Sequence, residues 1–307
     1  MKLAFLGTSA FAVPSLLALL EAGHRVLGIV TQPDRPCGRG ARLAAPEVKT
    51  IALERGLPVH QPGHRAEVAD ILAALEPELG VVVACGIIFD RRALAAPRLG
   101  MINLHASLLP LYRGAAPINW CLRDGRDVTG VTTMHVSPKL DSGDIILQRK
   151  VPIGPADDAG SLGEKLARVG ASLLGETLAA IEGGRAPRVP QRAAEATYAP
   201  ALTRSDEALD FSQAARAVVN HVRALSPRPG AYARLGGCDV KVWAAHPAGA
   251  SGGAQPGTVL GTACDSLLIA CGTGSVALDS VQPAGGRSMS GKAFSNGYLA
   301  QTRVDRR

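Results

Sequence analysis

One continuous stretch constrains the fold of this chain more than any other: residues 101–118, MINLHASLLPLYRGAAPI. It begins as an apolar strand, passes through a loop that contains Pro110 and Gly114, and continues into a helix that begins near Ala115. Proline and glycine end a strand and set a turn. Because open α/β sheets hold ligands where their strands end, this order of elements predicts an α/β fold with a ligand site in the loop.

Two polar side chains belong to the strand of this stretch. Asn103 and His105 are two residues apart, so their side chains point to the same side of a strand. An amide donor and an imidazole on one face can bind and protonate an oxygen that gains negative charge. The alternative is a core histidine, satisfied by a backbone carbonyl, beside a structural asparagine. Taken alone, the pair favours neither interpretation.

The beginning of the chain predicts a parallel sheet. Residues 2–6 form an apolar strand, Pro14 fits the first turn of a helix that ends near Glu21, and residues 25–31 form a second strand. A strand, a helix and a strand in this order make a βαβ unit. Residues 79–84, LGVVVA, are typical of a central strand buried on both faces. The turn after the first strand lacks the glycine fingerprint of dinucleotide sites, and the sequence gives no indication of NAD.

The last third of the chain has a different pattern. After a helix at 213–225, short β-like runs alternate with glycine turns, which is typical of a small OB-like β-barrel. Before it, residues 185–204 have several prolines, mixed charges and little periodicity, as an interdomain linker does. We therefore expect a Rossmann-like catalytic domain at residues 1–186, a linker at 187–206 and an OB-like domain at 207–307. This last domain either contacts a nucleic-acid backbone or only docks on the first.

The overall charge favours an acidic partner. The 307 residues carry a formal net charge of +7, which fits nucleic acid. The loop QPDRPCGRGARL at 32–43 sets Arg39 and Arg42 beside glycines, a composition suited to phosphate contacts, although most such loops are only solvated. The six cysteines show neither a CxxC pair nor a nearby histidine pattern, which argues against zinc and against a disulfide framework. No apolar run is long enough to span a membrane, and we expect a cytoplasmic protein.

Several segments resemble one known family. NLH at 103–105, followed by SLLP at 107–110 and RGAAPI at 113–118, is similar to the signature of the folate-dependent formyltransferases. TQPDRPCGRG at 31–40 and VQPAGGRSMS at 281–290 resemble further segments of that family. The resemblance therefore covers nearly the whole chain, and its RGAAPI ending is similar to the members that act on initiator methionyl-tRNA.

The resemblance implies a reaction and its participants. A formyl group would pass from 10-formyltetrahydrofolate, the co-substrate, to the amino group of methionine on initiator tRNA, for translation initiation. No metal is required, and we expect a monomer. The family pattern LDxG at 140–143 places the catalytic carboxylate at Asp141. The implied residues are Asn103, His105 and Asp141 for catalysis, Ser107, Leu108, Leu109 and Pro110 for folate, and Arg39 and Arg42 for tRNA.

The chain departs from the family pattern at Cys85, Lys139 and Arg228, where tyrosine, glycine and tryptophan are usual. Nothing near Cys85 in the sequence would stabilise a thiolate, so we expect this side chain to pack and not to react. Two other functions stay open. A formyltransferase for a small amine, such as a nucleotide-linked amino sugar, would not need the arginine-rich loop or the barrel. A catalytically silent RNA-binding protein would show no folate-dependent turnover.

Overall fold

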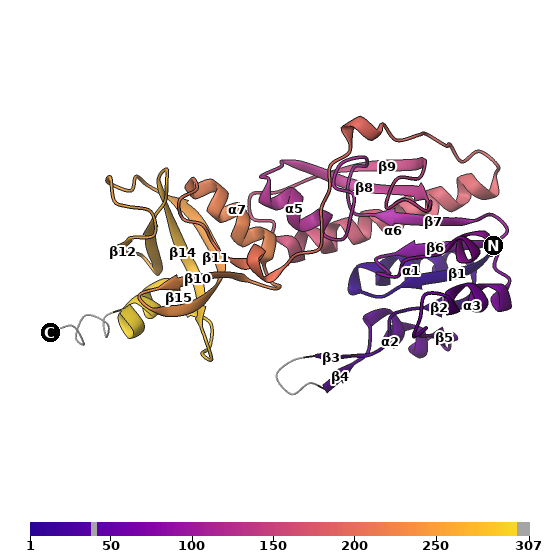
Figure 1. Cartoon of the computed structure of the whole chain (residues 1–307), viewed down its shortest axis with the longest axis horizontal. Helices are drawn as coiled ribbons and strands as arrows, with labels where there is room; N and C mark the ends of the chain where they lie inside the picture. Colours follow the sequence, from indigo (N-terminus) through magenta and orange to yellow (C-terminus); the bar gives the residue numbers. More distant parts are fainter. Residues whose placement is uncertain (38–41, 300–307) are drawn as a thin grey trace. The chain divides into compact units, whose positions relative to one another are not determined.

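The computed structural model describes residues 1–37 and 42–299 of the chain (Figure 1). The chain divides into two compact units. The first is made of residues 1–117, 128–152 and 163–200, and the second of residues 118–127, 153–162 and those from 201 on. In the described part of the chain, no helix is both long enough and apolar enough to cross a membrane.

A seven-stranded sheet organises the first unit, with the strand order β5-β2-β1-β6-β7-β8-β9. The strands from β5 to β7 pair in parallel, whereas β8 and β9 are antiparallel additions at one edge. This mostly parallel sheet confirms the predicted α/β fold. The strands are β1 (Lys2–Gly7), β2 (Arg25–Val30), β5 (Val59–His60), β6 (Leu79–Val83), β7 (Met101–His105), β8 (Val128–His135) and β9 (Ile145–Pro152).

Helices connect the parallel strands, and the apolar run of β6 is buried at every residue, as expected for a central strand. Asp90 caps the short helix before β7, since its side chain accepts a hydrogen bond from the N–H of Ala93 at 2.8 Å. A small hairpin, β3 (Arg35–Cys37) and β4 (Arg42–Ala44), follows β2. The helices are α1 (Val13–Glu21), α2 (Glu47–Glu54), α3 (Glu67–Leu75), α4 (Arg91–Ala95) and α6 (Ala159–Glu182), the last beginning in the second unit.

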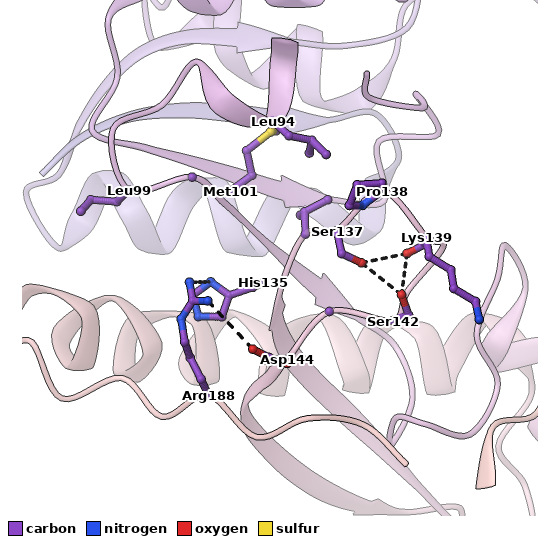
Figure 2. Close-up of a pocket in the computed structure, with 13 residues that line it drawn as sticks. Leu94, Leu99, Met101, His135, Ser137, Pro138, Lys139, Ser142, Asp144 and Arg188 are labelled. Atoms are coloured by element: carbon purple, nitrogen blue, oxygen red, sulfur yellow. Dashed lines mark hydrogen bonds and ion pairs between the residues drawn. The ribbon is translucent and has the colours of Figure 1, made fainter. Parts of the chain in front are cut away.

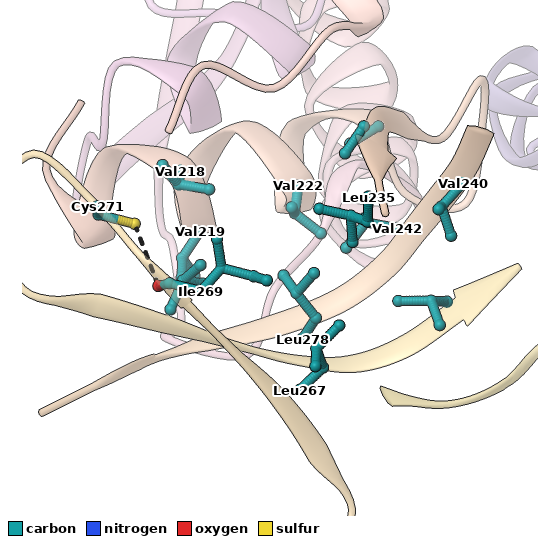
Figure 3. Packing of buried hydrophobic residues seen from close by; sticks show 14 of the residues in the cluster. Val218, Val219, Val222, Leu235, Val240, Val242, Leu267, Ile269, Cys271 and Leu278 are labelled. Atoms are coloured by element: carbon teal, nitrogen blue, oxygen red, sulfur yellow. Dashed lines mark hydrogen bonds between the residues drawn. The ribbon is translucent and has the colours of Figure 1, made fainter. Parts of the chain in front are cut away.

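The second unit is built on an antiparallel sheet with the order β10-β11-β14-β13-β12, and β15 pairs with β14. The valines of α7 recur at helical spacing and cover this sheet, and Figure 3 shows Val218 and Val222 above Leu278. This agrees with the predicted small β-barrel domain. The elements are α5 (Pro117–Arg123), α7 (Ala215–Leu225), β10 (Ala231–Leu235), β11 (Cys238–Ala248), β12 (Val259–Ala263), β13 (Ser266–Ala270), β14 (Ser275–Pro283), β15 (Met289–Ser290) and α8 (Gly291–Phe294).

Residues 189–199 run along the first unit, and we call this segment the strap. Val189 and Ile145 exchange two backbone hydrogen bonds, at 2.9 and 3.0 Å. The N–H of Arg113 donates to the carbonyl of Thr197 at 2.9 Å, and the N–H of Ala199 donates to the carbonyl of Arg113 at 2.7 Å. The strap therefore pairs backbone polar groups with the loop that follows β7 and with the first residue of β9.

Candidate active site

Strand β7 carries two of the predicted catalytic residues, Asn103 and His105, which lie toward its carboxyl end inside the sheet of the first unit. His105 is buried, with 6% of its surface exposed, and Asn103 is half-buried. Nε2 of His105 lies 2.9 Å from the carbonyl oxygen of Tyr112. A carbonyl oxygen can only accept, so Nε2 carries a proton and donates it to this bond. The other ring nitrogen, Nδ1, is therefore the one available for chemistry.

The third predicted residue, Asp141, lies on the turn between β8 and β9. Its Oδ2 is 3.8 Å from Nδ1 of His105, so the structure brings the imidazole and the carboxylate together. This distance exceeds a hydrogen bond but lets the carboxylate stabilise a positive charge on the ring. Oδ2 also accepts a hydrogen bond from the N–H of Gly114 at 2.8 Å. Asp141 has a φ of 46°, a left-handed conformation that aspartate adopts more readily than most residues.

The segment predicted to bind folate, Ser107–Pro110, forms a hydrogen-bonded loop directly after β7. Ser107 is fully buried, and its hydroxyl donates to the carbonyl of Leu111 at 2.6 Å. Thr132 of β8 donates to the carbonyl of Ser107 at 2.6 Å and accepts from the N–H of Leu109 at 3.2 Å. Of the four residues, Leu108 and Pro110 are half-buried, whereas Ser107 and Leu109 are buried. The polar groups of Ser107 and Leu109 are thus engaged within the protein.

A cavity of about 470 Å³ lies beside the turn that carries Asp141 (Figure 2). One part of its lining is apolar, from Leu94, Leu99 and Met101. Another part is polar and charged, and includes Lys139 and Arg188. Ser107–Pro110 are not among its lining residues, so sequence reasoning missed this cavity. The signal that could have found it is the position of residues 136–144, which flank Asp141 on both sides.

His135, at the end of β8, borders the cavity in a neutral state. Its Nδ1 lies 3.4 Å from a guanidinium nitrogen of Arg188, which donates to it (Figure 2). Burial, followed by repulsion from Arg188, lowers the pKa of His135, and Asp144 offsets this only in part. The positive charges in the lining are therefore those of Arg188 and Lys139, and the carboxylate of Asp144 lies 3.9 Å from Arg188.

Cys85, where the family usually has tyrosine, is packed in the apolar core of the first unit with 3% of its surface exposed. Burial raises the pKa of its thiol to about 12. The thiol is therefore protonated at neutral pH and is not activated as a nucleophile. In the described residues no group of three or more His, Cys, Asp or Glu side chains could hold a metal ion.

Of the two arginines predicted to contact tRNA, only Arg42 belongs to the described residues. Arg39 lies outside the described residues, and Arg42 begins β4. The start of the hairpin is anchored by Asp34, which binds Nζ of Lys49 through both carboxylate oxygens at 2.8 Å. Gln61 joins the same cluster, because its Oε1 accepts from Lys49 at 2.8 Å. The stem of the hairpin is thus fixed to α2 and to the region of β5.

Two family models match the chain, one over its first part and one over its last part. The model described as "Formyl transferase" matches residues 1–178, and the model described as "Formyl transferase, C-terminal domain" matches residues 201–299. A methionyl-tRNA formyltransferase from Moorella thermoacetica is 47% identical over 300 residues, which cover 97% of this chain and 96% of the relative. The same enzyme from Symbiobacterium thermophilum is 46% identical over 301 residues, 97% of this chain and 92% of the relative.

Solved structures share the fold at low identity. HypX from Aquifex aeolicus, in complex with tetrahydrofolic acid, superposes with a TM-score of 0.69 and 18% identity, over 97% of this chain and 47% of that one. The sugar 3N-formyl transferase WlaRD, in the presence of dTDP and 5-N-formyl-THF, gives a TM-score of 0.67 and 16% identity, over 92% and 97% of the two chains. At these identities the likeness concerns the fold.

Proposed function

The chain belongs to the formyl transferase family, and on that premise we propose that it formylates the methionine of initiator methionyl-tRNA. The enzyme transfers the formyl group of 10-formyltetrahydrofolate to the amino group of that methionine, for translation initiation. The observation that carries this proposal is the similarity to methionyl-tRNA formyltransferases at 47% identity across 97% of the chain.

The chemistry follows from the residues at the end of β7. The amine attacks the formyl carbon, a C–N bond forms, and the former carbonyl oxygen becomes an oxyanion. Asn103 and a protonated Nδ1 of His105 donate hydrogen bonds to that oxyanion. Asp141 balances the imidazolium charge across 3.8 Å and takes the proton that the amine loses, directly or through water. Collapse of the intermediate then breaks the bond to N10 of the folate, and N10 leaves with the proton that Asp141 took from the amine, passed on directly or through water.

The folate is assigned to the cavity beside Asp141. Its apolar lining suits a flat heteroaromatic ring, and Lys139 and Arg188 complement the acidic tail of the co-substrate. Leu108 and Pro110 border the formyl-bearing end, and Ser107 and Leu109 hold that loop in place through the bonds to Leu111 and Thr132. The cavity lies next to Asp141, because the lining residues 137–139 and 142–144 flank this aspartate in the sequence.

The tRNA is assigned to the basic hairpin and to the second unit, with Arg39 and Arg42 as phosphate contacts. A formal net charge of +7 supports an anionic partner of this kind. We also propose that the protein is cytoplasmic and monomeric.

The proposal is tested by offering the purified protein two acceptors with 10-formyltetrahydrofolate: charged initiator tRNA and a nucleotide-linked amino sugar. We expect formyl transfer to the tRNA and none above background to the sugar. Transfer to the sugar alone would replace the proposed acceptor, while the family assignment would stand.

A further inference from the structure

We propose that Gln191, in the strap, is a positioning residue that holds the turn carrying Asp141. The inference rests on the proposed function, because it concerns the support of the same catalytic carboxylate. No sequence pattern marks this glutamine, which lies in a proline-containing segment with little periodicity. Its role is visible only in the bonds that its side-chain amide makes.

The amide nitrogen of Gln191 makes two hydrogen bonds to the turn. Nε2 lies 2.9 Å from the carbonyl oxygen of Asp141 and 2.8 Å from the carbonyl oxygen of Gly143. A side-chain amide has two N–H donors, so both are used on this one turn. The glutamine therefore binds the backbone on both sides of Ser142.

The orientation of this amide is set by Arg113, a buried arginine with 2% of its surface exposed. Its Nε and one Nη lie 3.1 and 2.7 Å from Oε1 of Gln191. A guanidinium can only donate, so the glutamine oxygen must face it and the NH₂ group must face the turn. Arg113 is fixed in turn by its backbone bonds to Thr197 and Ala199 of the strap.

The turn needs external support for two reasons. Asp141 is in the left-handed region at a φ of 46°, and Gly143 approaches the carbonyl of His135 so closely that a Cβ would collide with it. At the same time the Asp141 carboxylate must keep its place opposite His105. Misplacement of a reacting group by about 1 Å can cost about 10²-fold in rate. Gln191 supplies the support without contacting the reacting atoms.

The substitution Gln191→Glu separates positioning from folding. A glutamate keeps the length of the side chain and an oxygen facing Arg113, so the new ion pair with the buried guanidinium offsets the loss of the bonds to the turn. Its second oxygen replaces the NH₂ group, loses both donor bonds and is repelled by the two carbonyls. Glu195→Gln is the matched control, because Glu195 lies in the same strap and its carboxylate is paired with the exposed Arg192.

We expect Gln191→Glu to lower kcat about 10- to 100-fold, with KM for charged tRNA within about 2-fold of wild type and an unchanged Tm. A readout that does not depend on activity is hydrogen exchange at the N–H of Gly114, which donates to the Asp141 carboxylate. It should exchange faster in Gln191→Glu and normally in Glu195→Gln. Gln191→Asn, which keeps the amide but is one methylene shorter, should change both quantities in the same direction.

Wild-type kcat in folded Gln191→Glu, or unchanged protection of Gly114, would overturn the inference. A fall in kcat that merely follows a fall in Tm in both variants would also overturn it, since the role would then be structural. If the wild-type protein did not formylate charged tRNA, the proposed function would fail, and the Gly114 exchange would still decide the role of Gln191.

Discussion

Among the single residues, the role of His105 depends on which of its two ring nitrogens faces the reaction. The bond from Nε2 to the Tyr112 carbonyl fixes the tautomer and leaves Nδ1 toward Asp141. The two interpretations of His105 offered by the sequence, a core histidine and a catalytic one, are therefore compatible with each other. One nitrogen is satisfied as in a core histidine, and the other faces a carboxylate.

Replacement of Asn103 or His105 by alanine should reduce kcat by about 10²–10⁴-fold, because each change removes one of the two proposed donors to the oxyanion. The double variant should lose much less than the product of the two effects, since the residues act as one unit. Steady-state formyl transfer by each folded variant is the measurement. Strictly multiplicative losses would contradict a shared oxyanion site.

Cys85→Ala should keep most of the activity, because burial raises the pKa of this thiol to about 12 and keeps it from acting as a nucleophile at neutral pH. Alkylation by iodoacetamide at pH 8 provides the check, with the exposed Cys264 as internal control. Cys264 should react in minutes to hours and Cys85 should not. Rapid modification of Cys85 with loss of activity would contradict its packing role.

At the scale of elements, the sequence predicts the parts whose pattern is local. The buried run of β6 and the same-side pair on β7 follow from composition and alternation. The strap does not, since its backbone bonds go to Ile145 and Arg113, which are far from it in the chain. The cavity could not be predicted from the sequence for the same reason. Its lining comes from separate segments of the chain, namely α4, the start of β7, residues 135–144 and Arg188. Long-range pairing of irregular segments leaves no periodic signal.

Helix α7 should make the second unit sensitive to acid through His221, whose Nε2 donates to the carbonyl of Asp206 at 2.6 Å. Burial lowers its pKa from 6.5, and this outweighs the carbonyl bond that raises it. The unfolded chain therefore binds the proton first as the pH falls. Stability is fully present above pH 6.5 and is lost as the pH falls below it.

Urea unfolding of the second unit, followed between pH 7.5 and 5.5, tests this prediction. The midpoint should fall with pH in the wild type and fall less in His221→Gln, which can still donate to the Asp206 carbonyl. The carboxyl of Asp206 has a pKa lowered from 3.8, mainly by its bonds to Thr203, so it does not titrate in this window. Equal acid sensitivity of the two proteins would contradict the assignment to His221.

At the scale of the whole molecule, a formal net charge of +7 and 47% identity to a methionyl-tRNA formyltransferase over 97% of the chain fit a polyanionic substrate such as tRNA. If Arg39 and Arg42 contact tRNA phosphates, replacing each by alanine should flatten the dependence of log affinity on log salt by about 0.7–0.9. The KM for 10-formyltetrahydrofolate should not change, because the cavity residues are untouched. A double variant with wild-type salt dependence would mark the hairpin as a solvated loop.

The ratio of kcat/KM for charged initiator tRNA to kcat/KM for free methionine, measured with saturating 10-formyltetrahydrofolate, shows whether the enzyme acts on tRNA. We expect a strong preference for the charged tRNA, because binding energy from the nucleic acid orients the amine beside His105 and Asp141. Asp141→Asn should reduce transfer to the charged tRNA by about 10²–10⁴-fold at unchanged fold. Equal use of free methionine, or full activity of Asp141→Asn, would contradict the account.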